Sequence, residues 1–119
     1  QAMADLMALF ESDLISQGKV KEFYLILSTI VRRYLGRTYK IFIMESTTGQ
    51  VQHLLHRRFV DPKLIQNIYD FLHQCDLVKF ARQIPGSPTI SVHKDTAQSI
   101  IDEIQQQMSK LEESSAKQI

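Results

Sequence analysis

The sequence predicts a mainly α-helical domain, a helical bundle with a winged-helix-like core and a small β-hairpin wing. Apolar residues recur at three- and four-residue spacing along most of the chain, which is typical of amphipathic helices. Between residues 78 and 92, two short runs of apolar and β-forming residues instead flank a Pro-Gly-Ser-Pro turn. The length of 119 residues, with 44% hydrophobic and 23% charged residues, fits one globular domain over residues 1–119.

The first two helices are predicted over residues 3–16 and 19–39. The first ends before Gln17-Gly18, because glycine readily stops a helix. The second has the strongest apolar pattern of the chain, so we expect it to form the centre of the core. The run Ile41 to Met44 that follows predicts a brief strand or an extended, buried connector.

Capping residues mark the next two helix starts. Thr47 and Gln50 fit a capping box, in which each side chain accepts a hydrogen bond from the backbone amide of the other residue. Asp61 followed by Pro62 predicts another start, since the amide proton that proline lacks has no partner at the first helical position. We expect this third central helix to run from residue 62 to about residue 75.

The last helix is predicted over residues 94–113. Its apolar residues follow coiled-coil spacing, but only over about two heptads. Helices 3–16 and 94–113 would then flank a core of residues 19–92. A homodimer that forms through these terminal helices is one expected possibility.

Charge is unevenly distributed, although the net charge is only +1. Residues 19–40 hold six cations and one anion, whereas residues 95–119 hold five anions and two cations. Two interpretations follow: acidic terminal helices lie beside basic central ones within the fold, or the basic residues meet an anionic partner. The candidate partner-binding residues are Arg32, Arg33, Arg37, Arg57 and Arg58.

No residue pattern predicts a catalytic or metal site. The single cysteine, Cys75, cannot form an internal disulfide, and the predicted helix C-terminus around it disfavours a thiolate. His53 and His56 share a helix face, but no further ligand pattern joins them, so solvated histidines are favoured over a zinc site. The glycines are scattered and form no phosphate-binding loop. We expect no enzymatic activity, no cofactor and no small-molecule substrate.

The winged-helix layout raises DNA binding as an alternative function. The helix that starts at Pro62 would then enter the major groove of the DNA. Its outward residues would be Lys63, Gln66, Asn67, Asp70 and Gln74. One cation offset by one anion is a poor surface for a polyanion, so nucleic acid is the less favoured partner.

Three segments carry a resemblance to a known family. They are FYLILSTIVRRYLGRTYKI, EST followed by TGQVQHLL, and LIQNIYDFLHQCDLVKFA. Over residues 19–104 the chain resembles the cytoplasmic C-terminal domain of bacterial inner-membrane proteins of the Bat aerotolerance type. The matching elements are Arg-Tyr-Leu at residues 33–35, a Glu-x-Thr-Thr-like helix start at residue 45 and Asp-Leu-Val-Lys-Phe-Ala at residues 76–81.

The resemblance implies a non-enzymatic protein-interaction module at the cytoplasmic face of the bacterial inner membrane, in an envelope-associated complex with a MoxR-like ATPase. Because the chain begins Gln-Ala-Met, we expect a piece of a longer protein that contacts the membrane only through a missing upstream segment. Asp76 and Lys79 are expected to tie the exit of the third central helix to its neighbours. The residues expected to shape the fold are Tyr34, Thr47, Asp61, Asp76, Lys79 and Phe80.

Overall fold

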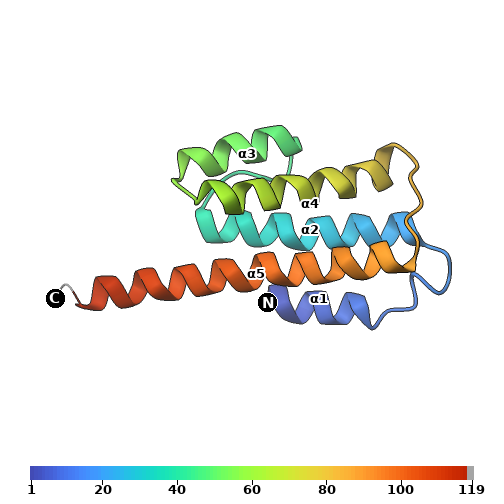
Figure 1. Cartoon of the computed structure of the whole chain (residues 1–119), viewed down its shortest axis with the longest axis horizontal. Coiled ribbons are helices and arrows are strands. Elements are labelled where there is room, and N and C mark those ends of the chain that lie inside the picture. Colours follow the sequence, from blue (N-terminus) through green and yellow to red (C-terminus); the bar gives the residue numbers. More distant parts are fainter. Residues whose placement is uncertain (118–119) are drawn as a thin grey trace.

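The computed structural model describes residues 1–117, and these form five helices. The helices are α1 (Ala2–Phe10), α2 (Val20–Tyr39), α3 (Thr48–Arg57), α4 (Pro62–Phe80) and α5 (Ser87–Lys117). Figure 1 shows α2 and α4 side by side at the centre, α3 against α4 on one side, and α5 and α1 beyond α2 on the other side. The last turns of α5 project past the other helices.

The core forms where α2 meets α4 and α5. From α2 it takes Tyr24, Leu27, Val31 and Leu35, which lie three or four residues apart, together with Phe23, and all five are almost fully buried. Burial of such side chains is the main favourable term in folding, at about 25 cal/mol per Å² of apolar surface. The second helix is therefore the centre of the core, as its apolar pattern predicts.

Both predicted helix starts carry their caps. Thr47 Oγ1 accepts a hydrogen bond from the Gln50 amide at 3.1 Å, and Gln50 Oε1 accepts one from the Thr47 amide at 2.8 Å. Asp61 Oδ2 accepts from the Leu64 amide at 3.3 Å, with Pro62 in the first turn of α4. These contacts satisfy amides that have no partner inside the helix.

The prediction of a β-hairpin wing is wrong, because residues 1–117 contain no strand. The segment expected to form the second strand is instead the first two turns of α5, which begins at Ser87 and not at residue 94. The Ile90 amide donates to the Gly86 carbonyl at 3.0 Å, so Pro88 lies in a first helical turn, where its missing amide proton costs nothing. The core is therefore a plain helical bundle and not a winged helix.

Two other boundaries differ from the prediction. The first helix ends at Phe10, and residues 11–18 form turns that close at Gly18, whose φ of +77° suits a residue without a side chain. The helix expected to end near residue 75 continues to Phe80. Residues 41–44 form no strand, so the brief-strand alternative is wrong, and the expected buried connector is buried only at Ile43, since Phe42 and Met44 are exposed. No helix in the described part of the chain is long and apolar enough to cross a membrane.

Candidate functional site

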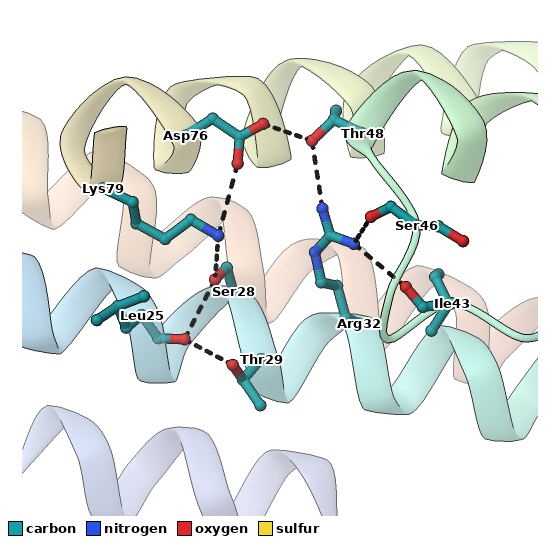
Figure 2. A network of polar contacts seen from close by, with 9 residues as sticks. All are labelled: Leu25, Ser28, Thr29, Arg32, Ile43, Ser46, Thr48, Asp76 and Lys79. Carbon is teal, nitrogen blue, oxygen red and sulfur yellow. Dashed lines mark hydrogen bonds and ion pairs between the residues drawn. The ribbon is translucent and has the colours of Figure 1, made fainter. Parts of the chain in front are cut away.

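A buried arginine anchors the connection between α2 and α3. Arg32 lies on α2, is only 9% exposed, and directs its guanidinium at this connection (Figure 2). Its Nη1 atom donates to the carbonyl oxygen of Ser46 at 2.7 Å and to that of Ile43 at 3.3 Å. Burial lowers the pKa of Arg32, while the nearby Asp76 carboxylate opposes that shift.

The anchor continues through Asp76 to α3 and α4. Arg32 Nη2 donates to Thr48 Oγ1 at 3.4 Å, and Thr48 Oγ1 donates to Asp76 Oδ2 at 2.6 Å. Lys79 Nζ lies 3.5 Å from Asp76 Oδ1 and donates to Ser28 Oγ at 3.2 Å (Figure 2). We call Ser28, Arg32, Thr48, Asp76 and Lys79 the buried network. It joins α2, the start of α3 and the last turns of α4. Its one carboxylate, Asp76, pairs directly with Lys79 and is linked to Arg32 through the Thr48 hydroxyl.

The buried network determines which side chains of the connection face outward. Ile43 points into the core at 2% exposure, whereas Phe42 is 81% exposed and Met44 is 50% exposed. Gly36 on α2 allows the connection to lie this close, because an added Cβ would be 3.0 Å from Ile43 Cγ2 and 3.3 Å from the Ile41 carbonyl oxygen. A glycine inside a helix costs stability, so this close approach gives Gly36 a structural role.

A mostly apolar groove of about 330 Å³ forms where the connection lies along α2. We call it the loop groove; its lining residues are Arg33, Gly36, Arg37, Ile41, Phe42, Ile43, Met44 and Glu45. Arg33 and Arg37 are exposed and lie one helical turn apart on α2. A groove with an apolar floor and two arginines beside it suits a partner segment that carries an apolar side chain next to carboxylates.

The structure separates the five predicted partner-binding arginines. Arg32 is enclosed in the buried network, so it is removed from the candidate surface. Arg33 and Arg37 line the loop groove. Arg57 and Arg58 lie at the C-terminal end of α3, where Arg58 Nη2 donates to the Lys40 carbonyl at 3.1 Å.

Cys75 is enclosed in the core. It lies within α4 and not at its end, so the helix-dipole argument does not apply to it. The side chain is completely buried, and burial raises the pKa of the Cys75 thiol to about 12. His53 and His56 are both exposed, and within residues 1–117 no group of three His, Cys, Asp or Glu residues is placed to hold a metal ion.

A pair of side chains that joins α2 to α5 is absent from the predictions made from the sequence. Tyr24 is fully buried, and its hydroxyl hydrogen-bonds with His93 Nδ1. Burial raises the pKa of Tyr24 and lowers the pKa of His93. The same end of α5 places Lys94 Nζ over the ring of Phe10, 5.5 Å from its centroid. The sequence does contain a sign of this pair, because the residues from Ile90 to Ala97 have helical spacing that would place His93 on the buried side of a helix. The prediction of a strand over residues 89–92 excluded that helix.

The remaining predicted structural residues occupy different environments. Tyr34 is half-buried, and burial raises its pKa, whereas Phe80 is 74% exposed at the end of α4 with Lys79 Nζ 5.1 Å from its ring centroid.

Searches against protein-family models, curated proteins and solved structures find no match for this chain. The function is therefore inferred from the geometry of the surface.

Proposed function

We propose that this chain is a non-enzymatic protein-interaction module that binds an acidic segment of a partner protein in the loop groove. The observation that carries the proposal is the exposed, anchored apolar connection beside Arg33 and Arg37. In the bound state an apolar side chain of the partner fills the groove next to Phe42 and Met44. Carboxylates that flank this side chain pair with the two arginines.

The anchoring supports a binding role for physical reasons. A surface that is already ordered loses little conformational entropy when a partner binds, so more of the contact energy appears as affinity. Arg32 holds the connection by two hydrogen bonds to backbone carbonyls, and a third joins it to Thr48 at the start of α3. The groove is therefore organised before binding.

The cellular setting of the module is proposed from the resemblance to the Bat-type domains. In that setting the module lies at the cytoplasmic face of a bacterial inner membrane and takes part in an envelope-associated complex. A MoxR-like ATPase is then the candidate partner, and the acidic segment belongs to that complex.

The geometry favours this function over DNA binding. The DNA alternative requires a wing, and the chain from 1 to 117 has none. The solvent-facing side of α4 offers Lys63 and Asp70, a pair of opposite charge, and Gln66 Nε2 already donates to Asp70 at 2.8 Å. A surface of this kind neutralises few phosphates.

A titration with a defined peptide tests the proposal. The probe is a synthetic peptide with one leucine flanked by glutamates, added to the ¹⁵N-labelled chain. We expect amide shifts to change at residues 33–45, and the Arg33→Gln/Arg37→Gln variant to bind about tenfold or more weakly. The matched control is Lys19→Gln/Lys21→Gln, which removes the same charge from the opposite end of the bundle.

The result that contradicts the proposal is equally specific. Equal losses of affinity in the two double variants would mean that overall charge and not the groove binds the peptide. Unchanged shifts at residues 33–45 with a peptide that binds elsewhere would also reject it. A scrambled peptide of the same charge without leucine measures the contribution of the apolar side chain.

A further inference from the structure

The turn between α3 and α4 presents a nearly bare aromatic ring. Phe59 is 94% exposed, and its φ of +59° is the left-handed conformation that glycine adopts more easily. The ring gains almost no packing from the folded chain, while its backbone carries a conformational cost. A bulky residue in such a place supports a hypothesis of function, because strain without packing gives the fold nothing.

Cations precede this ring in the sequence, and more lie in the neighbouring turn and helix start. The C-terminal ends of α2 and α3 and the start of α4 gather at one end of the molecule (Figure 1). We call Lys40, Arg57, Arg58 and Lys63 the basic end; Asp61 is the single anion in residues 57–63. The hydrogen bond from Arg58 to the Lys40 carbonyl joins the two turns that form this end.

The acidic residues lie on another side. α5 carries Asp102, Glu103, Glu112 and Glu113; Figure 1 places α5 and α3 on opposite sides of the α2 and α4 pair, with the last turns of α5 projecting past the same end of the molecule as the basic end. A negatively charged surface would therefore approach from the α3 side. On that side it meets the basic end first.

We propose that the basic end, with Phe59 at its tip, docks on the anionic surface of a lipid bilayer. A convex, isolated ring suits a fluid interface, which deforms around it, better than a protein partner, which would need a matching pocket. Aromatic rings partition into the bilayer interface, and arginine and lysine side chains pair with acidic headgroups. The inference goes beyond the loop groove and does not rest on it.

A single-residue fluorescence experiment tests this docking on the full chain. The chain contains no tryptophan, so Phe59→Trp introduces a single reporter, and Phe80→Trp is the matched control at the other end of α4. With mixed phosphatidylcholine and phosphatidylglycerol vesicles, we expect the emission of the Phe59→Trp variant to shift to the blue. We expect no shift with phosphatidylcholine alone, and none for Phe80→Trp with either vesicle.

Vesicle sedimentation measures the contribution of charge. Each cation near an acidic membrane contributes about fivefold in affinity, so Arg57→Gln/Arg58→Gln should bind phosphatidylglycerol vesicles about 25-fold more weakly. The control Lys19→Gln/Lys21→Gln removes two cations from the opposite end and should retain wild-type binding. Phe59→Asn removes the ring and keeps a residue that tolerates the left-handed backbone, and it should lower binding about tenfold.

Several outcomes would overturn the proposal. They are an unshifted Phe59→Trp emission at saturating phosphatidylglycerol, an equal shift for Phe80→Trp, or equal loss in the two charge variants. Poly-glutamate separates the lipid from an acidic protein: if it shifts the Phe59→Trp emission as vesicles do, the occupant is a protein and the lipid docking is wrong. Met44→Ser changes the loop groove without changing the charge and should retain vesicle binding, so failure here is distinguishable from failure of the groove.

Discussion

The connections that follow α2 and α4 share a left-handed backbone residue and an exposed apolar side chain, but they differ in how they are held. Residues 40–47 begin at Lys40 with φ +53° and expose Phe42, while residues 81–86 contain Arg82 with φ +57° and expose Ile84 at 84%. Arg32 donates to two backbone carbonyls of the first connection. In the described residues, no side chain donates to a carbonyl of residues 81–86. Both connections line a groove, of about 330 Å³ at the first and about 250 Å³ at the second, but only the first has an interior charge that anchors its backbone.

The electrostatics of the two bundle ends differ as well. The basic end has four cations and one anion, whereas residues 11–22 at the opposite end hold two lysines, Lys19 and Lys21, and three anions. Arg82 adds one cation there, and Lys79 is paired with Asp76 in the buried network. An exposed phenylalanine thus occurs at both ends, but only Phe59 lies within a positively charged surface.

The largest expected effect comes from breaking the buried network. Asp76→Ala leaves Lys79 and Arg32, each only 9% exposed, without their shared carboxylate. Loss of one partner of a fully buried pair costs about 3–5 kcal/mol, and the 27% exposure of the Asp76 side chain reduces the expected loss to about 2–3 kcal/mol. Urea unfolding measures it. Asp70→Ala on the exposed side of α4 is the control, and equal losses in both variants would show that the network adds no stability.

Two glycine substitutions should have opposite signs. Gly36→Ala places a Cβ against Ile43 and the Ile41 carbonyl, so we expect a loss of about 1 kcal/mol despite the better helix propensity of alanine. Gly49→Ala in α3 meets nothing within 4 Å and should gain about 0.5–1 kcal/mol. Thermal unfolding of both variants measures the difference. If Gly36→Ala were as stable as Gly49→Ala, the connection would not be held tightly against α2.

Replacement of Phe59 should stabilise the chain while it weakens vesicle binding. The left-handed backbone costs a bulky residue about 1 kcal/mol, and the exposed ring contributes little packing, so Phe59→Gly should raise stability by about 0.5 kcal/mol. Phe80→Gly lies in α4 and should lose about 0.5–1 kcal/mol, because glycine is a poor helix former. Calorimetry on the two variants compares the ends directly. A loss of stability in Phe59→Gly would reveal packing that the exposure does not show.

The smallest effect concerns pH. Burial lowers the pKa of His93 below 6.5, so the unfolded chain takes up a proton more readily than the folded chain as pH falls. The contribution of neutral His93 to stability is complete above pH 6.5 and declines as pH falls below that value. The contribution of His93 is measured by comparing how the free energy of unfolding depends on pH in the wild type and in His93→Gln. An unchanged slope between the two chains would show that His93 does not titrate differently on folding.

Local sequence signals predicted the helix caps and the central helix. The caps are predictable because Thr47 with Gln50, and Asp61 with Pro62, form their contacts within a single helical turn. The wing failed because Pro-Gly-Ser-Pro fits both a hairpin turn and a helix start, and only packing of Ile90 into the core decides between them. The network joins residues up to 51 positions apart, so no local pattern could assemble it. A partial signal did exist: Ser28, Arg32 and Leu35 share the buried face of α2.

Hydrogen exchange at the two connections tests the central claim, that the buried network holds residues 40–47 in place. Three amides have backbone acceptors and can be compared directly: those of Ile41 and Ser46 in the first connection and that of Gln83 in the second. We predict slower exchange at Ile41 and Ser46 than at Gln83, and a selective increase at Ile41 and Ser46 in Arg32→Met. Equal rates at the three amides in the wild type, or rates at Ile41 and Ser46 that Arg32→Met leaves unchanged, would contradict it.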